Sequence, residues 1–163
     1  MHHPGRTRTW SFPVEIDARW GEGLVAVPAG ETVVVDVRLE AIHEGILATG
    51  SASSRYEGEC GRCLEPVAEP VEVEFQELFA YPGTAEGDVE IHDDRVDLEI
   101  PVRDAIVVSL PFQPVCRPDC PGLDPVTGER RADGAVGPAA APVDPRWAAL
   151  ARLASETEHP ASE

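Results

Sequence analysis

The sequence predicts an α+β fold that consists mainly of an antiparallel β-sheet, with one helix before the second cysteine pair and a short C-terminal helix. Three observations predict it. Apolar and polar residues alternate from residue 32 to about residue 80, the period becomes helical after Glu99, and a short helical stripe returns at Trp147. We expect about five or six strands, in a sheet that could be curled or barrel-like.

The strands are predicted by period-two alternation. In "TVVVDVRLEAI", Val33, Val35 and Val37 share one face of an extended chain. After the turn "HEG", the stretch "ILATGSASSRYEGEC" alternates as far as Cys60, and "VEVEFQELF" resumes the alternation. These two stretches form a hairpin with "CGRCLEP" at its tip. Shorter candidate strands are "FPVEID", "LVAVP" and "DRVDLEI".

One helix is predicted in "IPVRDAIVVSLPF". Val102, Ile106 and Leu110 share a helical face, Pro101 suits a first helical turn and Pro111 ends the run. The two adjacent β-branched valines in its middle leave a strand as the alternative. This helix leads the chain toward the second cysteine pair.

The chain divides into five predicted segments. They are a flexible N-terminus (1–11), a single β-rich domain that carries the cysteine site (12–128), a flexible Gly-, Ala- and Pro-rich linker (129–143), a C-terminal helix (144–154) and a disordered tail (155–163). Within the domain, "YPGTAEGDVEIHDDR" predicts a mobile acidic loop. The C-terminal helix is too short to be stable alone, so its Trp147 face should dock on the sheet or on a partner.

No signal peptide or membrane span is predicted, so a cytoplasmic location without a membrane partner is expected. The formal net charge is -17. The stretch from Glu57 to Glu99 contains fourteen carboxylates and only two arginines, Arg62 and Arg95. Such a surface is either a solvated acidic face or a docking surface for a basic protein.

All four cysteines lie in two close pairs, which are Cys60 with Cys63 and Cys116 with Cys120. Disulfides rarely persist in the cytosol, whereas four thiolates in two pairs suit a closed, tetrahedral, structural zinc site. Reduced thiols without metal and redox exchange are the alternatives. Redox exchange is disfavoured because nearby glutamates should raise the pKa of the first thiol pair. A closed site leaves no coordination position for hydrolysis, and no catalytic residues are predicted.

Four arginines lie near the cysteines. They are Arg62, Arg117, Arg130 and Arg131. They are candidate contacts to RNA phosphates, with a purely structural role as the alternative. Binding RNA by broad phosphate neutralisation is disfavoured at this net charge.

The stretches "CGRCLEPV", "LPFQPVCRPDCPGLDPVTGE" and "DPRWAALARL" together resemble the YceD family in its actinobacterial form, over roughly residues 30–153. The resemblance implies a cytoplasmic, non-enzymatic accessory factor for accumulation of large-subunit ribosomal RNA, and thus for biogenesis of the large ribosomal subunit. Many relatives carry a run similar to "GLCPVCG" where this chain has Asp124 and Thr127. Asp124 is therefore an alternative metal ligand.

Charge and resemblance together predict that the acidic sheet binds a basic ribosomal protein while the cysteine-bearing lobe reaches ribosomal RNA in a precursor of the large subunit. Two other classes of protein remain open. One is a thiol redox protein, and the other is a zinc-bearing regulator that binds nucleic acid.

Overall fold

The computed structural model describes residues 5–83, 89–91, 95–133 and 146. The chain forms two compact units that divide between Cys120 and Pro121, so the domain expected at 12–128 extends across this boundary. Within the described residues, the first unit holds six strands and one helix. They are β1 (Thr7–Glu15), β2 (Val25–Ala26), β3 (Thr32–Ala41), β4 (Gly45–Glu59), β5 (Pro66–Ala80), β6 (Val89–Glu90) and α1 (Glu99–Ser109).

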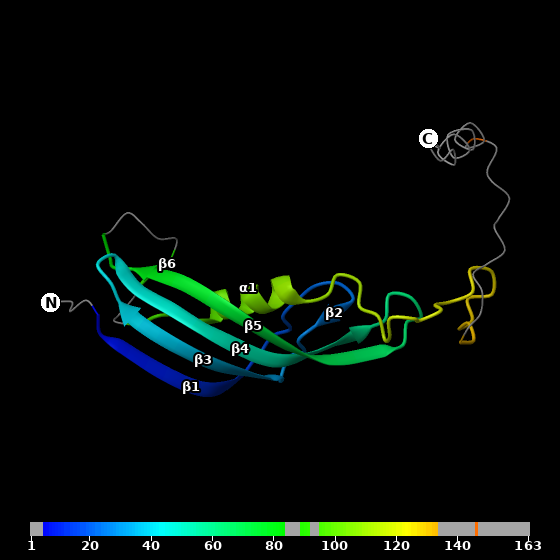
Figure 1. The fold of residues 1–163 in the computed structure, drawn as a ribbon, viewed down its shortest axis with the longest axis horizontal. Helices are drawn as coiled ribbons and strands as arrows, with labels where there is room; N and C mark the ends of the chain where they lie inside the picture. Colours follow the sequence, from blue (N-terminus) through cyan, green and yellow to red (C-terminus); the bar gives the residue numbers. More distant parts are fainter. Residues whose placement is uncertain (1–4, 84–88, 92–94, 134–145, 147–163) are drawn as a thin grey trace, which may run out of the picture. The chain divides into compact units, whose positions relative to one another are not determined.

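The six strands form one sheet in the order β1-β3-β4-β5-β6, with β2 paired to β4 (Figure 1). All pairs are antiparallel except β5 with β6, which run parallel over two residues. The mainly antiparallel sheet is therefore confirmed, but the barrel-like form is wrong. The described strands leave the sheet open, because it ends on one side at the two-residue β6, which is too short to close a barrel.

Burial along the strands follows the predicted alternation. Val33, Val35 and Val37 of β3 are buried, whereas the residues between them are exposed. Ala48 and Ala52 of β4 continue the same face, because Val35 pairs with Ala52 in register. Other buried residues on this inner face are Tyr56, Val67, Val71, Phe75 and Phe79. Helix α1 packs against β5 (Figure 1).

The helical interpretation of "IPVRDAIVVSLPF" is confirmed, since α1 buries Pro101, Val102 and Ile106. The strand predicted in "DRVDLEI" is wrong. Asp97 Oδ1 accepts a hydrogen bond of 2.9 Å from the backbone N–H of Glu99, which satisfies a donor of the first helical turn and starts the helix inside this stretch.

The strand expected in "FPVEID" is present but longer, and one further strand lies where none was expected. β1 covers "FPVE" and begins earlier, at Thr7, inside the segment 1–11 expected to be flexible, because the alternating "TRTWSF" pairs with β3. β6 lies inside the predicted acidic loop. The C-terminal helix at 144–154, apart from Arg146, the tail at 155–163 and most of the linker lie outside the described residues. No helix in the described part of the chain is long and apolar enough to cross a membrane.

Two substitutions on α1 test this packing. The side chain of Ile106 is fully buried, whereas that of Val108 is 86% exposed. We expect Ile106→Ala to lower the free energy of unfolding by about 2–5 kcal/mol, because it leaves a cavity between α1 and the sheet. Val108→Ala should change it by about 0.5 kcal/mol or less. Equal effects in denaturant titrations would mean that α1 does not pack as described.

Candidate metal centre and acidic sheet face

The first cysteine pair lies in the tight turn between β4 and β5. The backbone N–H of Cys60 donates to the Glu65 carbonyl, and that of Leu64 donates to the Cys60 carbonyl. Leu64 takes a positive φ of 61°, which closes the turn. The backbone N–H of Arg62 points at Cys60 Sγ at 3.4 Å. Backbone donors aimed at a sulfur in a hairpin turn are the local geometry of a zinc knuckle.

The second pair reaches this turn from the segment after α1. The N–H of Gly61 donates to the Pro114 carbonyl at 2.8 Å, which joins the two segments two residues before Cys116. The N–H of Cys120 donates to the Arg117 carbonyl, so the second pair also lies in a turn. Pro111 and Pro114 favour an extended path between the helix and this turn.

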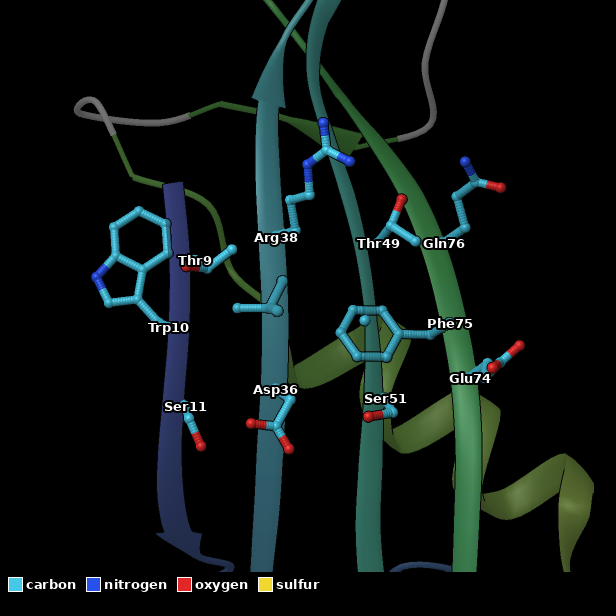
Figure 2. Close-up of a pocket in the computed structure, with 12 residues that line it drawn as sticks. Thr9, Trp10, Ser11, Asp36, Arg38, Thr49, Ser51, Glu74, Phe75 and Gln76 are labelled. Atoms are coloured by element: carbon cyan, nitrogen blue, oxygen red, sulfur yellow. The ribbon is translucent and has the colours of Figure 1, made fainter. Parts of the chain in front are cut away.

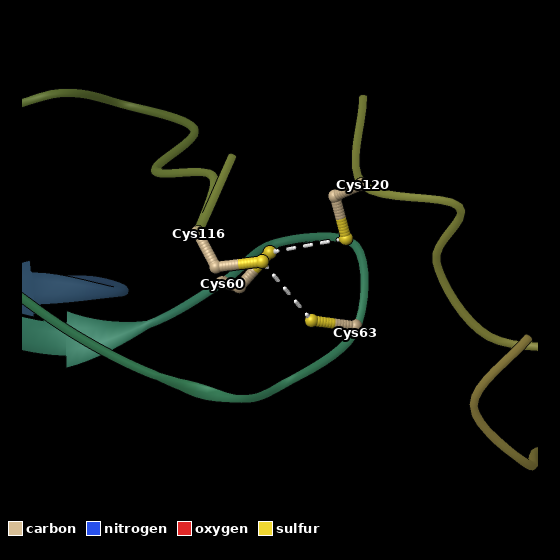
Figure 3. A group of neighbouring side chains, drawn as sticks. All are labelled: Cys60, Cys63, Cys116 and Cys120. Atoms are coloured by element: carbon tan, nitrogen blue, oxygen red, sulfur yellow. Dashed lines mark hydrogen bonds between the residues drawn. The ribbon is translucent and has the colours of Figure 1, made fainter. Parts of the chain in front are cut away.

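The four sulfur atoms converge (Figure 3). All Sγ atoms lie within 4.8 Å of one another. Cys60 Sγ lies 3.9 Å from Cys120 Sγ, and Cys63 Sγ lies 3.7 Å from Cys116 Sγ. A zinc ion with four sulfur ligands at its usual bond length has sulfur–sulfur distances of about 3.8 Å. The cluster therefore has the spacing of a tetrahedral metal site, and all four cysteines are free thiols rather than disulfides.

The environment separates the pKa values of the thiols. Burial would raise the pKa of Cys60, but hydrogen bonds from the backbone at Cys116, Arg62 and Cys63 lower it to about 6. Burial, followed by the neighbouring thiols of Cys120 and Cys63, raises the pKa of Cys116 to about 12.

The raised pKa expected for the first pair from its flanking glutamates is wrong for Cys60, because backbone donors outweigh burial there. A backbone hydrogen bond at Glu65 would lower the pKa of Cys63. Burial and the neighbouring thiols of Cys120 and Cys60 outweigh this bond, so the pKa of Cys63 is raised. The backbone donors thus favour the thiolate form of Cys60, and metal binding would displace protons from its neighbours.

Arg62 braces the cluster, which is the structural alternative that the sequence left open for it, although its bonding partners were not predicted. Its Nη1 donates to the carbonyl oxygens of Pro118 and Cys120, at 3.1 and 3.2 Å. One side chain inside the first pair therefore holds the backbone of the second pair. Only the position of Arg62 between two cysteines hinted at this contact.

The other three arginines are placed differently. Arg117 is half-buried, and its Nε lies 3.3 Å from Asp119 Oδ1. Arg130 and Arg131 belong to the second compact unit, where Arg130 is exposed and the N–H of Arg131 donates to the Gly122 carbonyl. The four arginines thus divide between the two units, with Arg62 and Arg117 in the first and Arg130 and Arg131 in the second.

Asp124 forms a turn within the second unit. Its Oδ1 accepts hydrogen bonds from the backbone N–H groups of Val126 and Thr127, at 2.8 and 3.0 Å. These bonds lower the pKa of the Asp124 carboxyl. Among the described residues, the group that could hold a metal contains the four cysteines and not Asp124.

The sheet face opposite the core is polar and acidic. Alternation with the buried residues places six carboxylates and two arginines on it, among the described residues of β3, β4 and β5. They are Asp36, Glu40, Glu57, Glu59, Glu72, Glu74, Arg38 and Arg55. Arg38 is engaged by Glu40 at 2.9 Å. We call this surface the acidic sheet face.

A shallow groove of about 770 Å³ crosses four strands (Figure 2). Two polar rows on the acidic sheet face line it, and the members of each row are paired in register. The rows are Thr9, Arg38, Thr49 and Gln76, and Ser11, Asp36, Ser51 and Glu74. The exposed face thus offers hydrogen-bond donors and acceptors over several strands.

An open antiparallel sheet, a cluster of four thiols in two turns and an acidic sheet face define a β-sheet protein with a candidate metal centre. A family profile described as "Large ribosomal RNA subunit accumulation protein YceD" matches residues 48–154. The chain belongs to this YceD family, which confirms the resemblance seen in the sequence. The family name implies a role in accumulation of the large ribosomal subunit, and it describes no catalysed reaction.

The relatives are mycobacterial. An uncharacterized protein of Mycobacterium tuberculosis is 42% identical over 157 residues, which cover 92% of this chain and 75% of the relative. One of Mycobacterium bovis matches with the same values. One of Mycobacterium leprae is 41% identical over 113 residues, which cover 65% of this chain and 52% of the relative. No solved structure gives a significant match.

The bracing role of Arg62 can be tested by truncation. Arg62→Ala should lower the free energy of unfolding by about 1–2 kcal/mol, because two charge-assisted hydrogen bonds are lost at the surface. Arg103→Ala is the matched control, since the ion pairs of Arg103 with Glu99 and Asp104 are exposed and 3.8 Å long, worth about 0.5 kcal/mol. Thermal and urea unfolding measure both. If the two variants lose equal stability, Arg62 does not brace the cluster.

Proposed function

We propose that this chain is a non-enzymatic accessory factor in biogenesis of the large ribosomal subunit, acting in accumulation or processing of its ribosomal RNA. In this proposal the four cysteines hold a structural zinc ion and the acidic sheet face binds a basic ribosomal protein of the precursor particle. The convergence of the four sulfur atoms, in a chain of the YceD family, carries the proposal.

Zinc is favoured by the donors and by their spacing. Four sulfur atoms within 4.8 Å of one another, two pairs of them 3.7 and 3.9 Å apart, suit zinc, and a fully sulfur-bound ion has no open position for a substrate. Cys60, Cys63 and Cys120 are buried, which disfavours exchange with an external disulfide. A structural role for the ion therefore fits better than redox chemistry or catalysis.

A basic protein partner is favoured by the charge of the acidic sheet face. Its carboxylates are exposed, apart from the half-buried Glu40, and they outnumber the arginines there. A negative electrostatic field speeds the encounter with positively charged partners and repels polyanions. A ribosomal protein rich in Lys and Arg would thus be bound before or while it meets ribosomal RNA.

Direct contact with RNA is a second candidate activity. Exposed Arg130, with Arg131 beside it, offers guanidinium groups to phosphates. Arg62 suits this role less well, because one of its nitrogens already donates to two carbonyls.

Metal analysis tests the zinc site. Protein purified without chelators should carry about one zinc ion per chain. Cys63→Ser should lose the zinc and lower the melting temperature, because the ion joins two remote segments. Asp124→Asn is the control, since it removes a carboxylate but keeps an acceptor for the turn, and it should retain zinc. A Cys63→Ser variant that keeps its fold and stability but loses thiol exchange would favour the redox alternative.

Charge removal tests the acidic sheet face. The double variant Glu72→Gln/Glu74→Gln should recover less ribosomal protein and precursor RNA in co-purification, and added salt should weaken the binding of the unaltered chain. Glu99→Gln/Asp104→Asn is the control, because it removes the same charge from exposed positions on α1. Equal losses in both variants would mean that overall charge, and not this face, directs binding.

A further inference from the structure

Strand β1 is an exposed edge. It pairs with β3 on one side, and no described strand lies on its other side (Figure 1). Eight of its nine residues are exposed, and Phe12 is half-buried. Trp10 is 43% exposed and Val14 is 41% exposed. An edge strand of this length presents a row of main-chain donors and acceptors that another strand can pair with.

The hydrogen bonds at the two ends of β1 determine which residues face this open edge. The N–H of Ala41 donates to the Arg6 carbonyl, and the N–H of Ile16 donates to the Glu31 carbonyl. Because bonding alternates along an antiparallel pair, the even-numbered residues direct their main-chain groups toward β3. The odd-numbered residues direct theirs outward. Pro13 is one of these odd-numbered residues. This agrees with the general rule that a proline in a strand lies where the ladder does not need its missing N–H group.

Pro13 divides the open edge. Thr7, Thr9 and Ser11 present both N–H and C=O groups, whereas Pro13 has no donor. A strand added to this edge can therefore form a complete ladder only from Thr7 to Ser11. Symmetric antiparallel pairing of two identical strands over this stretch has its centre at Thr9.

Charge distinguishes this edge from the other long strand edge of the sheet. Over most of its length β5 also lacks a second partner among the described strands, but it carries two prolines and four glutamates, which protect an edge. In contrast, no carboxylate side chain precedes Glu15 in the chain. The other charged residues at this edge are Arg8 on β1 and Arg6 just before it. Repulsion between two copies of this acidic chain is weakest at β1, while the arginines disfavour a basic peptide there.

We propose that β1 pairs with β1 of a second copy of this chain, antiparallel and centred on Thr9, so that two sheets join into one. Thr9 faces Thr9 and Thr7 faces Ser11, which forms about six main-chain hydrogen bonds. In this register Arg8 of each copy lies directly across from Trp10 of the other. These two side chains share a face of the sheet, at a distance where a guanidinium contacts an indole ring. The exposed Trp10 thereby gains a partner.

Sedimentation and light scattering of the full chain, under reducing conditions, test the proposal. We expect a dimer that dissociates on dilution, since the ladder is short. Thr9→Pro removes the central donors without touching β3 and should weaken the dimer by about tenfold or more. Glu15→Pro is the matched control, because residue 15 also faces outward but lies outside the ladder. It should leave the dimer intact.

Amide hydrogen exchange locates the contact in the unaltered protein, independently of whether Thr9→Pro folds. The amides of Thr7, Thr9 and Ser11 should exchange more slowly as protein concentration rises. A chain that remains monomeric at high concentration, a dimer that persists in folded Thr9→Pro, or an open-ended polymer would each overturn the proposal. Unchanged exchange at these three amides during dimerisation would overturn it as well.

Discussion

The architecture of the first unit depends on the meeting of two turns that are far apart in the sequence. β4 and β5 form a long hairpin, and a hairpin tip is ordinarily the part that frays. Here the tip is held by the bond from Gly61 to Pro114, by Arg62 and by the convergence of four sulfur atoms. The segment after α1 is fixed by the same contacts. Because the two segments share one buried cluster, loosening either would disperse the sulfur atoms of both.

The contact between these two turns also explains how the surface of the sheet can be so polar. A small sheet with one helix buries apolar residues on one face only, and the other face is left to charged and hydroxyl side chains. A cross-link between remote segments reduces the stability that the core alone must provide. The exposed face is then available for carboxylates, whose mutual repulsion would otherwise weigh against folding.

Much of this fold is encoded locally, which is why sequence reasoning found it. Alternation predicted β3, β4 and β5, and the cysteine spacing predicted the cluster. Three points that sequence reasoning missed share one cause, which is that each depends on a hydrogen bond to a backbone group. The start of α1 depends on a carboxylate of Asp97 that meets one N–H group, and Arg62 bonds to carbonyl oxygens that every residue type carries. The pKa of Cys60 is likewise governed by main-chain donors. Such partners leave no periodic pattern in the sequence.

The turn at Asp124 is closed by hydrogen bonds to its own side chains. The N–H groups of Val126 and Thr127 donate to Asp124 Oδ1, and the Thr127 hydroxyl accepts from the N–H of Glu129. Backbone bonds from Gly128 to Asp124 and from Asp124 to Glu129 close the same turn. A carboxylate and a hydroxyl therefore satisfy the backbone donors of this turn. Hydrogen bonding among its own residues can maintain this loop without a metal ion, and among the described residues the group that could hold a metal is the four-cysteine cluster.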